Sequence, residues 1–343
     1  MIKFYDIEAI NMDSIDALCE ASDKIIRSGN YVFGTEPFEE DFAEWNGNKH
    51  CIGVSSGTSA LHMALLALGI GPGDEVITVS HTFRATVSAI RYCGATPVYV
   101  DIDPDTYCMD AKQISSKITN NTKAILPVHI YGNVCDMDAI CRIANSHNIP
   151  VVEDCSQAHG STLNKKKVGT FGKIGTFSFY PGKGLGALGD AGCIVTDDDD
   201  IAEHLKELRS WDSTTIGYNY RLSNLQAEFL RIKLKNYNNI LKQKRSIAEI
   251  YNEHFTHCHT RKGVQHSYHI YPILVNDRNT VRKETNDKVA TGIHYPIPVH
   301  KFHSHKTGVH LPVTERIANT QLSLPIYPGV NAMKVIDVLG QYA

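Results

Sequence analysis

Two side chains in the segment 151–193 have the types and the placement needed for chemistry on a carbonyl compound. Asp154 ends the apolar run VVED, and Lys183 lies in the glycine-rich loop PGKGLG after the apolar stretch 174–180. A lysine amine can form a Schiff base with an aldehyde, and a carboxylate can keep a pyridine nitrogen protonated, so that the ring withdraws electrons. Pyridoxal 5'-phosphate (PLP) requires both groups. We therefore expect Lys183 to be catalytic and Asp154 to bind the cofactor ring.

A phosphate site is indicated by the segment 51–70, CIGVSSGTSALHMALLALGI, which predicts a strand, a turn of small residues and a helix. Gly57, Thr58 and Ser59 stand where this helix begins. Free backbone amides and the positive end of the helix dipole attract phosphate there, and the two hydroxyls can donate hydrogen bonds. The same residues also serve as an ordinary helix cap in many proteins, but the later lysine favours the phosphate interpretation.

Two further residues follow the ends of predicted strands, where ligands bind in open α/β sheets. Phe83 comes just after the strand pattern EVITVS at 75–80, so that its ring could stack on a cofactor or pack in the core. Gln157 stands three residues after Asp154 and could reach the ring hydroxyl of the cofactor. Both are predicted to bind the cofactor.

The elements that must position these residues follow an alternating pattern. Apolar strand patterns at 75–80, 96–103, 123–132 and 149–156 are separated by helical patterns such as 138–147. Nearly continuous apolar strands of this kind predict a parallel sheet that is covered by helices on both faces. The fold class is therefore α/β.

Composition and charge exclude several other classes of protein. The 343 residues are 42% hydrophobic and 21% charged, with a formal net charge of -3, which is ordinary for a globular protein. This charge favours neither nucleic acid nor a membrane surface as a partner. The N-terminal sequence has no apolar stretch typical of a signal peptide, and no apolar run approaches the length of a membrane span. We expect a cytoplasmic protein.

Cysteine and histidine usage indicates neither a disulfide framework nor a metal centre. The nine cysteines include no C-x-x-C pair, and their odd number suits a reducing compartment. The histidines in HFTHCHTRKGVQHSYH, 254–269, have spacings that match no closed zinc pattern. We expect no metal.

Three motifs, in this order along the chain, resemble the DegT/DnrJ/EryC1/StrS family of sugar aminotransferases. They are EDCSQAHGS at 153–161, FSFYPGKGLGALGDAG at 177–192 and GYNYRLSNLQAEFL at 217–230. The resemblance implies a fold-type I PLP enzyme. Its large domain, 1–235, would hold a mostly parallel seven-strand sheet between helices, and 236–343 would form a small C-terminal α/β domain. It also implies a homodimer with active sites shared at the interface.

The resemblance assigns roles to further residues. Ser178 matches a serine that binds the cofactor phosphate. Asn219, supported by Arg221, matches an asparagine that reaches the phosphate of the partner subunit. Substrate contacts are expected from four residues, which are Tyr31, Tyr180, His294 and Tyr295.

Two other positions in these motifs carry expectations. His159 is expected to be a structural histidine whose ring is satisfied by hydrogen bonds beneath the site. Gly184 follows the lysine where many members of the family have asparagine, and we interpret it as a local loop change that leaves the chemistry of Lys183 intact.

The reaction implied by the resemblance has two stages. Lys183 first holds PLP, L-glutamate donates its amino group to give pyridoxamine phosphate (PMP) and 2-oxoglutarate, and a nucleotide-linked keto-sugar then receives the group. The freed lysine amine moves the proton. The YPGK version of the lysine motif is similar to the branch that acts on dTDP-3-keto-6-deoxyhexoses, which we favour as substrate, in amino-sugar and polysaccharide biosynthesis.

Several alternatives remain. One is an aminotransferase for a 4-keto sugar nucleotide, and another is a non-catalytic, regulatory relative that keeps the PLP fold. Relatives that act as PMP-dependent dehydratases carry histidine in place of the lysine, so Lys183 speaks against that activity. A dinucleotide-binding dehydrogenase ranks lowest, because no G-x-G-x-x-G follows the first predicted strand.

Overall fold

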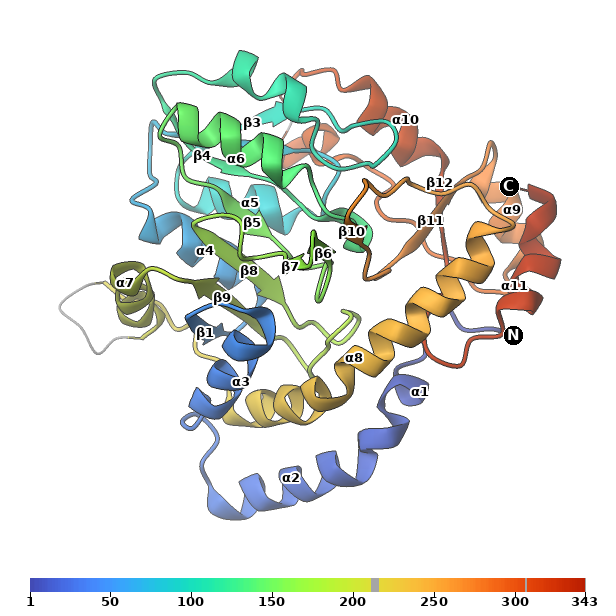
Figure 1. The fold of residues 1–343 in the computed structure, drawn as a ribbon, viewed down its shortest axis with the longest axis horizontal. Helices are drawn as coiled ribbons and strands as arrows, with labels where there is room; N and C mark the ends of the chain where they lie inside the picture. Colours follow the sequence, from blue (N-terminus) through green and yellow to red (C-terminus); the bar gives the residue numbers. More distant parts are fainter. Residues whose placement is uncertain (211–215, 306, 343) are drawn as a thin grey trace.

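The structure is a computed structural model that describes residues 1–210, 216–305 and 307–342. Among these residues, seven strands form a central sheet in the order β3-β2-β4-β5-β8-β9-β1 (Figure 1). Parallel bridges from Ile125 to Val151 and from Val128 to Asp154 join its two halves between β4 and β5. The strands are β1 (His50–Val54), β2 (Glu75–Val79), β3 (Thr96–Val100), β4 (Thr122–Leu126), β5 (Val152–Asp154), β8 (Ile174–Ser178) and β9 (Gly192–Thr196).

The sheet is mostly parallel, as the sequence predicts. Only β9 runs antiparallel to its neighbours, β1 and β8. Every residue of β9 is buried, and the other strands are buried over most of their length, because helices cover both faces. The covering helices are α3 (Glu36–Asn46), α4 (Gly57–Ala67), α5 (Ala85–Tyr92), α6 (Met137–Ser146), α7 (Asp199–Arg209) and α8 (Asn224–Asn252).

The C-terminal third forms a second hydrophobic core around a two-stranded antiparallel sheet. Its sheet consists of β11 (Tyr271–Leu274) and β12 (Gln321–Leu324), with helices α9 (Arg278–Thr285), α10 (Pro312–Thr320) and α11 (Ala332–Leu339) around it. The expected boundary at 235/236 falls inside α8, which continues without a break into the second core. The division into two domains stays a prediction.

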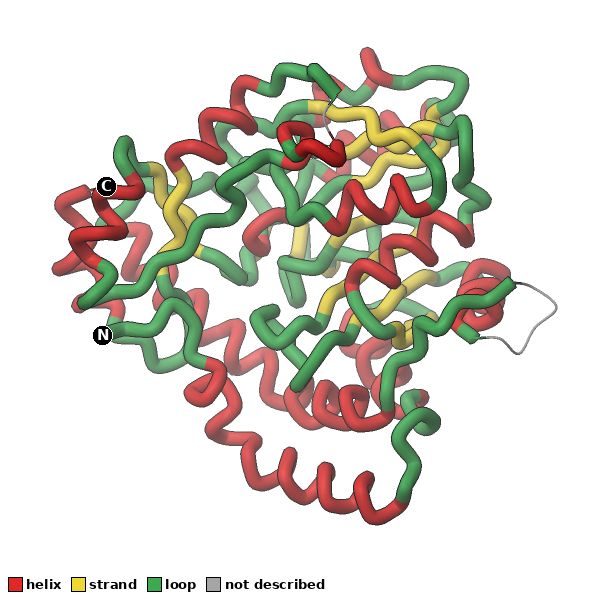
Figure 2. Tube along the Cα trace, turned by 180° about the vertical axis from the view of Figure 1, so that it is seen from behind, coloured by secondary structure: helices red, strands yellow, loops and turns green. Residues whose placement is uncertain are grey.

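The N-terminal segment returns to this second core, and the two termini lie on the same side of the molecule. Ile2 pairs in parallel with Val289, and α1 (Ile7–Asn11) follows. Figure 2 shows α2 (Ile15–Ser28) along the outer edge of the molecule, beside α8. A small three-stranded sheet contains β6 (Thr162–Leu163), β7 (Lys166–Lys167) and β10 (Val264–Gln265). In the part of the chain described, no helix is both long and apolar enough to cross a bilayer.

Candidate active site

A cavity of about 710 Å³ opens beside the carboxyl ends of β5 and β8, where the sequence predicts the site. Most of the predicted residues line it together. They are Gly57, Thr58, Phe83, Asp154, Gln157, Ser178, Tyr180, Lys183, His294 and Tyr295. The segments that carry them are up to 238 positions apart in the chain, so the parallel sheet and the C-terminal core are both needed to form this one space.

The start of α4 provides a site for an anion. The Ser56 side chain caps the helix by accepting a hydrogen bond of 3.1 Å from the Ser59 amide. The amides of Gly57 and Thr58 have no hydrogen-bond partner within the described residues, so they are free to bind a phosphate. A Cβ atom on Gly57 would come within 2.5 Å of the Ser178 Cβ, which places Ser178 directly against the helix end. Ser56 also lines the cavity, although the sequence analysis did not select it.

Asp154 presents a carboxylate that is 4% exposed and held in place by two donors. The Thr86 hydroxyl donates a hydrogen bond of 2.8 Å to Oδ2, and the Ser156 amide donates one of 3.1 Å to Oδ1. Thr82 extends this set, because its hydroxyl lies 2.8 Å from that of Thr86. A fixed, buried carboxylate can hold a protonated pyridine nitrogen.

Lys183 shares this cavity with Asp154. Burial lowers the pKa of its ammonium to about 8, while the Asp154 charge acts in the opposite direction. About one tenth of the amine is therefore neutral, and nucleophilic, at pH 7, far more than for an ordinary lysine. The Tyr5 hydroxyl fixes the loop by donating a hydrogen bond of 2.8 Å to the Lys183 carbonyl. Lys233 of α8 donates another to the Gly186 carbonyl.

Gln157 belongs to a network that connects the cavity to its aromatic wall. Its Oε1 accepts a hydrogen bond of 2.7 Å from the Tyr131 amide, and its Nε2 donates one of 2.8 Å to the Tyr295 hydroxyl. The Tyr295 ring lies 5.9 Å from that of Phe83, and the His294 ring stacks on Phe4 at 5.7 Å. Phe83 is 47% exposed, so it faces the open cavity rather than the core.

Four predicted residues do not line this cavity. Ser59 is buried, and its hydroxyl bonds to neighbouring serines at 2.8 Å. Tyr31 is 50% exposed, and its hydroxyl donates to the Ile26 carbonyl at 3.1 Å. Asn219 is exposed, and Arg221 pairs with Val54 at the edge of the sheet. The roles of Asn219 and Arg221 depend on a second subunit and stay predictions.

The structural role expected for His159 agrees with its packing, but the hydrogen bonds expected for its ring are absent among the described residues. Its ring is 1% exposed and packs 5.4 Å from Phe177 and 5.5 Å from Phe179, yet neither ring nitrogen has a hydrogen-bond partner in the chain as described. Burial, followed by the charge of Lys183, lowers its pKa to about 3. The histidine is therefore neutral and held by aromatic packing, which spacing in the sequence does not reveal.

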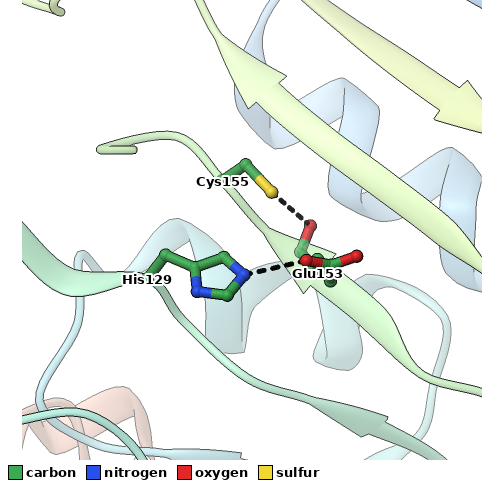
Figure 3. Close-up of side chains that lie close together, drawn as sticks. All are labelled: His129, Glu153 and Cys155. Atoms are coloured by element: carbon green, nitrogen blue, oxygen red, sulfur yellow. Dashed lines mark hydrogen bonds and ion pairs between the residues drawn. The ribbon is translucent and has the colours of Figure 1, made fainter. Parts of the chain in front are cut away.

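A buried group of His129, Glu153 and Cys155 lies at the central strand β5 and has ligand atoms suited to a metal (Figure 3). The Glu153 carboxylate already accepts hydrogen bonds from other groups of the protein. One Glu153 oxygen accepts from His129 at 3.0 Å and from the Gly169 amide at 2.9 Å, and the other accepts two amides of the loop 171–172. Glu153 therefore anchors this loop, and we interpret the group as structural.

The family model of the DegT/DnrJ/EryC1/StrS aminotransferase family matches residues 10–342. The chain belongs to this family. It is 41% identical to dTDP-3-amino-3,6-dideoxy-alpha-D-galactopyranose transaminase of Aneurinibacillus thermoaerophilus, covering 100% of this chain and 99% of that protein. It is 39% identical to UDP-N-acetyl-3-dehydro-alpha-D-glucosamine 3-aminotransferase of Acidithiobacillus ferrooxidans, covering 98% and 96%. The crystal structure of S. venezuelae DesV in complex with a ketimine intermediate superposes with a TM-score of 0.96 at 36% identity, covering 99% and 98%.

Membership of the DegT/DnrJ/EryC1/StrS family confirms the predicted fold class, the aminotransferase activity and PLP as the cofactor. One solved relative, a sugar aminotransferase from Streptococcus pneumoniae, is described in both a PLP form and a PMP form. The residues of the cavity fit this cofactor independently of the comparison. A buried carboxylate, a lysine with a lowered pKa and a helix start with free amides together meet the needs of its ring nitrogen, aldehyde and phosphate.

Several residues of the site were missed by sequence reasoning. They are Tyr5, Ser56, Thr82, Thr86, Ser156 and His269. Thr86 follows Phe83 by three residues and lies in the first turn of α5, so its position shortly after a strand end could have selected it. Nothing in the sequence connects Tyr5 to Lys183, which is 178 positions away.

Proposed function

We propose that this aminotransferase moves the amino group of L-glutamate to a nucleotide-linked keto-sugar, with a dTDP-3-keto-6-deoxyhexose as the first candidate. The observation that carries the proposal is the shared cavity of Lys183 and Asp154. The relative from Aneurinibacillus thermoaerophilus is named for a dTDP-3-amino-3,6-dideoxy sugar, which supports this choice of substrate. The Acidithiobacillus ferrooxidans relative is named for a UDP-sugar, so the nucleotide is the part of the proposal that most needs a test.

The residues that line the cavity have separate roles in this reaction. PLP, when bound, supplies an aldehyde for the amino group and a ring that accepts electrons. Asp154 holds the proton on the ring nitrogen, and the amides of Gly57 and Thr58 with the Ser178 hydroxyl bind the phosphate. Phe83 covers one ring face. The free Lys183 amine would move a proton from the donor carbon to the cofactor carbon, and the reverse transfer would serve the sugar.

Absorption spectra of the purified holoenzyme give the first test. We expect a near-visible cofactor band that disappears on addition of L-glutamate and returns on addition of the keto-sugar. Nucleotide-sugars with dTDP or UDP and with a 3-keto or 4-keto group are then compared by the rate of that return. Lys183→Ala should bind PMP with little change and should lose nearly all turnover.

A second candidate is the regulatory relative, and the 4-keto sugar nucleotide remains the rival substrate. Two relatives at similar identity carry names of a regulatory and a sensory protein. A protein that binds PLP but shows no spectral change with any amino acid or sugar nucleotide would favour regulation. The complete set of Asp154, Gln157, Ser178 and Lys183 in one cavity speaks for catalysis.

We further propose a cytoplasmic homodimer in which Asn219 and Arg221 of one subunit complete the phosphate site of the other. Asn219 is exposed on the monomer, as a residue with this role has to be. The exposed apolar side chains of Val32, Phe33 and Ile216 are suited to burial against a second subunit.

A further inference from the structure

The peptide amide of Tyr131 determines which way the Gln157 side chain faces. Tyr131 is fully buried and lies in the turn after β4, where it has φ 62°, a conformation that few residues with a side chain adopt. Its amide nitrogen lies 2.7 Å from Gln157 Oε1. Because a peptide N–H can only donate, the atom that meets it has to be the carbonyl oxygen of the side chain, and the NH2 group faces the other way.

The turn that carries Tyr131 is held by both its side chain and its main chain. The Tyr131 hydroxyl donates to the His294 carbonyl, and the Tyr131 carbonyl accepts from the Ile270 amide at 3.1 Å. His81 Nε2 lies 2.7 Å from the same hydroxyl and has to donate to it, since the single hydroxyl proton is used for His294. The direction of the Gln157 amide is therefore fixed by the fold.

The NH2 group of Gln157 in turn determines the direction of the Tyr295 hydroxyl. Its Nε2 donates to the Tyr295 oxygen at 2.8 Å, so the hydroxyl proton cannot be directed at Gln157. This proton has no acceptor among the described residues. Burial, and next the charge of Asp154, raises the pKa of the hydroxyl well above its usual value, so the group stays protonated. Tyr295 therefore keeps a hydrogen-bond donor at the wall of the cavity.

A second donor adjoins this hydroxyl. Gln157 Nε2 has two N–H bonds, and within the described part of the chain only one of them has an acceptor. Gln157 and Tyr295 both line the cavity. The Asp154 carboxylate, which lines it too, accepts instead from Thr86 and Ser156. Two adjacent donors of this kind suit an oxygen atom that carries negative charge and enters the cavity from outside.

The donor pair lies among residues that we assign to the cofactor ring. Gln157 follows Asp154, the carboxylate expected at the ring nitrogen, by three residues at the end of the same strand. The Tyr295 ring lies 5.9 Å from that of Phe83, which is expected to cover a ring face. PLP and PMP both carry an oxygen directly on this ring. The ring oxygen is therefore the acceptor that the arrangement favours.

We propose that the Tyr295 hydroxyl and the Gln157 amide together bind the ring oxygen of the cofactor, in a direction set by the Tyr131 main chain. Tyr295 is then a cofactor-binding residue, beyond the substrate contact that the family resemblance implies. The two donors stabilise negative charge on the ring oxygen. This inference depends on PLP as the cofactor and not on the proposed amino donor or sugar.

The first test measures binding of PMP to the full-length apoenzyme by calorimetry, because PMP binds without a bond to Lys183. Tyr295→Phe should weaken PMP binding about tenfold. The same variant should bind an analogue of PMP that lacks the ring hydroxyl within about twofold of wild type, since the acceptor oxygen is then missing. Tyr99→Phe, which removes a hydroxyl without a described partner in β3, is the matched control and should leave PMP binding unchanged.

Gln157→Glu tests the direction of the hydrogen bonds. The carboxylate still accepts from the Tyr131 amide, but it has no N–H and takes the Tyr295 proton on its other oxygen. Both donors are then lost, so PMP binding should fall further than in Tyr295→Phe. Adding Tyr295→Phe to Gln157→Glu should change PMP affinity by less than about twofold, because the hydroxyl no longer serves the ligand. Additive losses would contradict the direction that we infer.

Other outcomes also overturn the assignment. If Tyr295→Phe binds PMP like wild type and only raises the KM for the keto-sugar, Tyr295 is a substrate contact alone. An equal loss with PMP and with the analogue would indicate that the variant changes packing rather than a bond to the ring oxygen. Wild type that binds PMP as expected but aminates no keto-sugar would refute the proposed function, and the PMP measurements would still decide the role of Tyr295.

Discussion

The Tyr237 hydroxyl occupies the space in which a side chain at Gly184 would begin. A Cβ atom there would lie 2.4 Å from Tyr237 Oη and 3.5 Å from Cζ. Gly184→Ala should therefore destabilise the holoenzyme by about 1–3 kcal/mol through overpacking. Tyr237→Phe removes the clashing oxygen, so the double variant should recover most of that loss. A double-mutant cycle from urea unfolding measures the coupling, and strictly additive effects would contradict this explanation of the glycine.

Thr86→Val should weaken cofactor binding, because it removes a hydroxyl that donates to the Asp154 carboxylate. A hydrogen bond to a charged group contributes about 1.5–3 kcal/mol, so the dissociation constant of PLP should rise by roughly 10-fold to 100-fold. Fluorescence titration of the apoenzyme with PLP measures this dissociation constant. Thr320→Val, which removes an exposed hydroxyl bonded to its own helix, should leave PLP affinity unchanged.

Lys183 should lower the stability of the apoenzyme in a pH-dependent way. Its pKa is lowered to about 8 in the folded chain from the ordinary lysine value of 10.5, so the unfolded chain binds more protons between these values. Stability should then rise with pH through this range. Lys183→Met removes the cost of burying the charge and should stabilise the apoenzyme at pH 7 by up to about 3 kcal/mol. Thermal melts of wild type and Lys183→Met at pH 7 and pH 10 measure this difference in stability. If Lys183→Met is no more stable than wild type at pH 7, the prediction is wrong.

Glu153→Gln should destabilise the whole fold. The carboxylate accepts from His129 and from three amides of the segment 169–172, all of them inside the protein. Removing one partner of a buried ion pair leaves the other charge unpaired and costs about 3–5 kcal/mol. Calorimetric unfolding measures the loss. Glu249→Gln on the exposed face of α8 should change stability by less than about 0.5 kcal/mol.

Asn219→Ala tests the shared active site. If Asn219 of one subunit binds the phosphate in the other, the variant should bind PLP more weakly while sedimentation still shows a dimer. PLP affinity like that of wild type would mean that the cross-subunit contact has been misplaced. A monomeric wild-type protein with full activity would remove the basis of the dimer proposal.

The sequence could predict those site residues that stand at the end of a strand or just beyond it. Asp154, Gln157, Ser178 and Lys183 lie on adjacent parallel strands or just beyond them, so local pattern and chain order suffice to bring them together. The central sheet could be predicted for the same reason, since its strands are continuous apolar runs. The DegT/DnrJ/EryC1/StrS resemblance added roles that spacing alone does not provide.

Contacts between distant segments could not be predicted. Tyr5 and His269 reach the cavity because the N-terminal segment and the C-terminal core return to the sheet, and no periodicity encodes that return. Tertiary packing also determines whether a buried histidine ring forms hydrogen bonds. The hydrogen bonds expected for His159 are therefore a feature that its sequence position could not predict. Tyr31 lies outside the cavity of the single chain, and its role in substrate binding stays a prediction.

Helix α8 has a mechanical consequence. It contains no proline or glycine in 29 residues, which corresponds to a rod of about 44 Å. Lys233 holds the lysine loop, Arg245 donates to the His266 carbonyl at 2.9 Å, and Tyr251 donates to the Pro325 carbonyl at 2.8 Å. The two cores cannot rotate against each other without bending this rod. We therefore expect the exchange of the amino donor for a bulky sugar nucleotide to proceed through movements of segments that α8 does not hold.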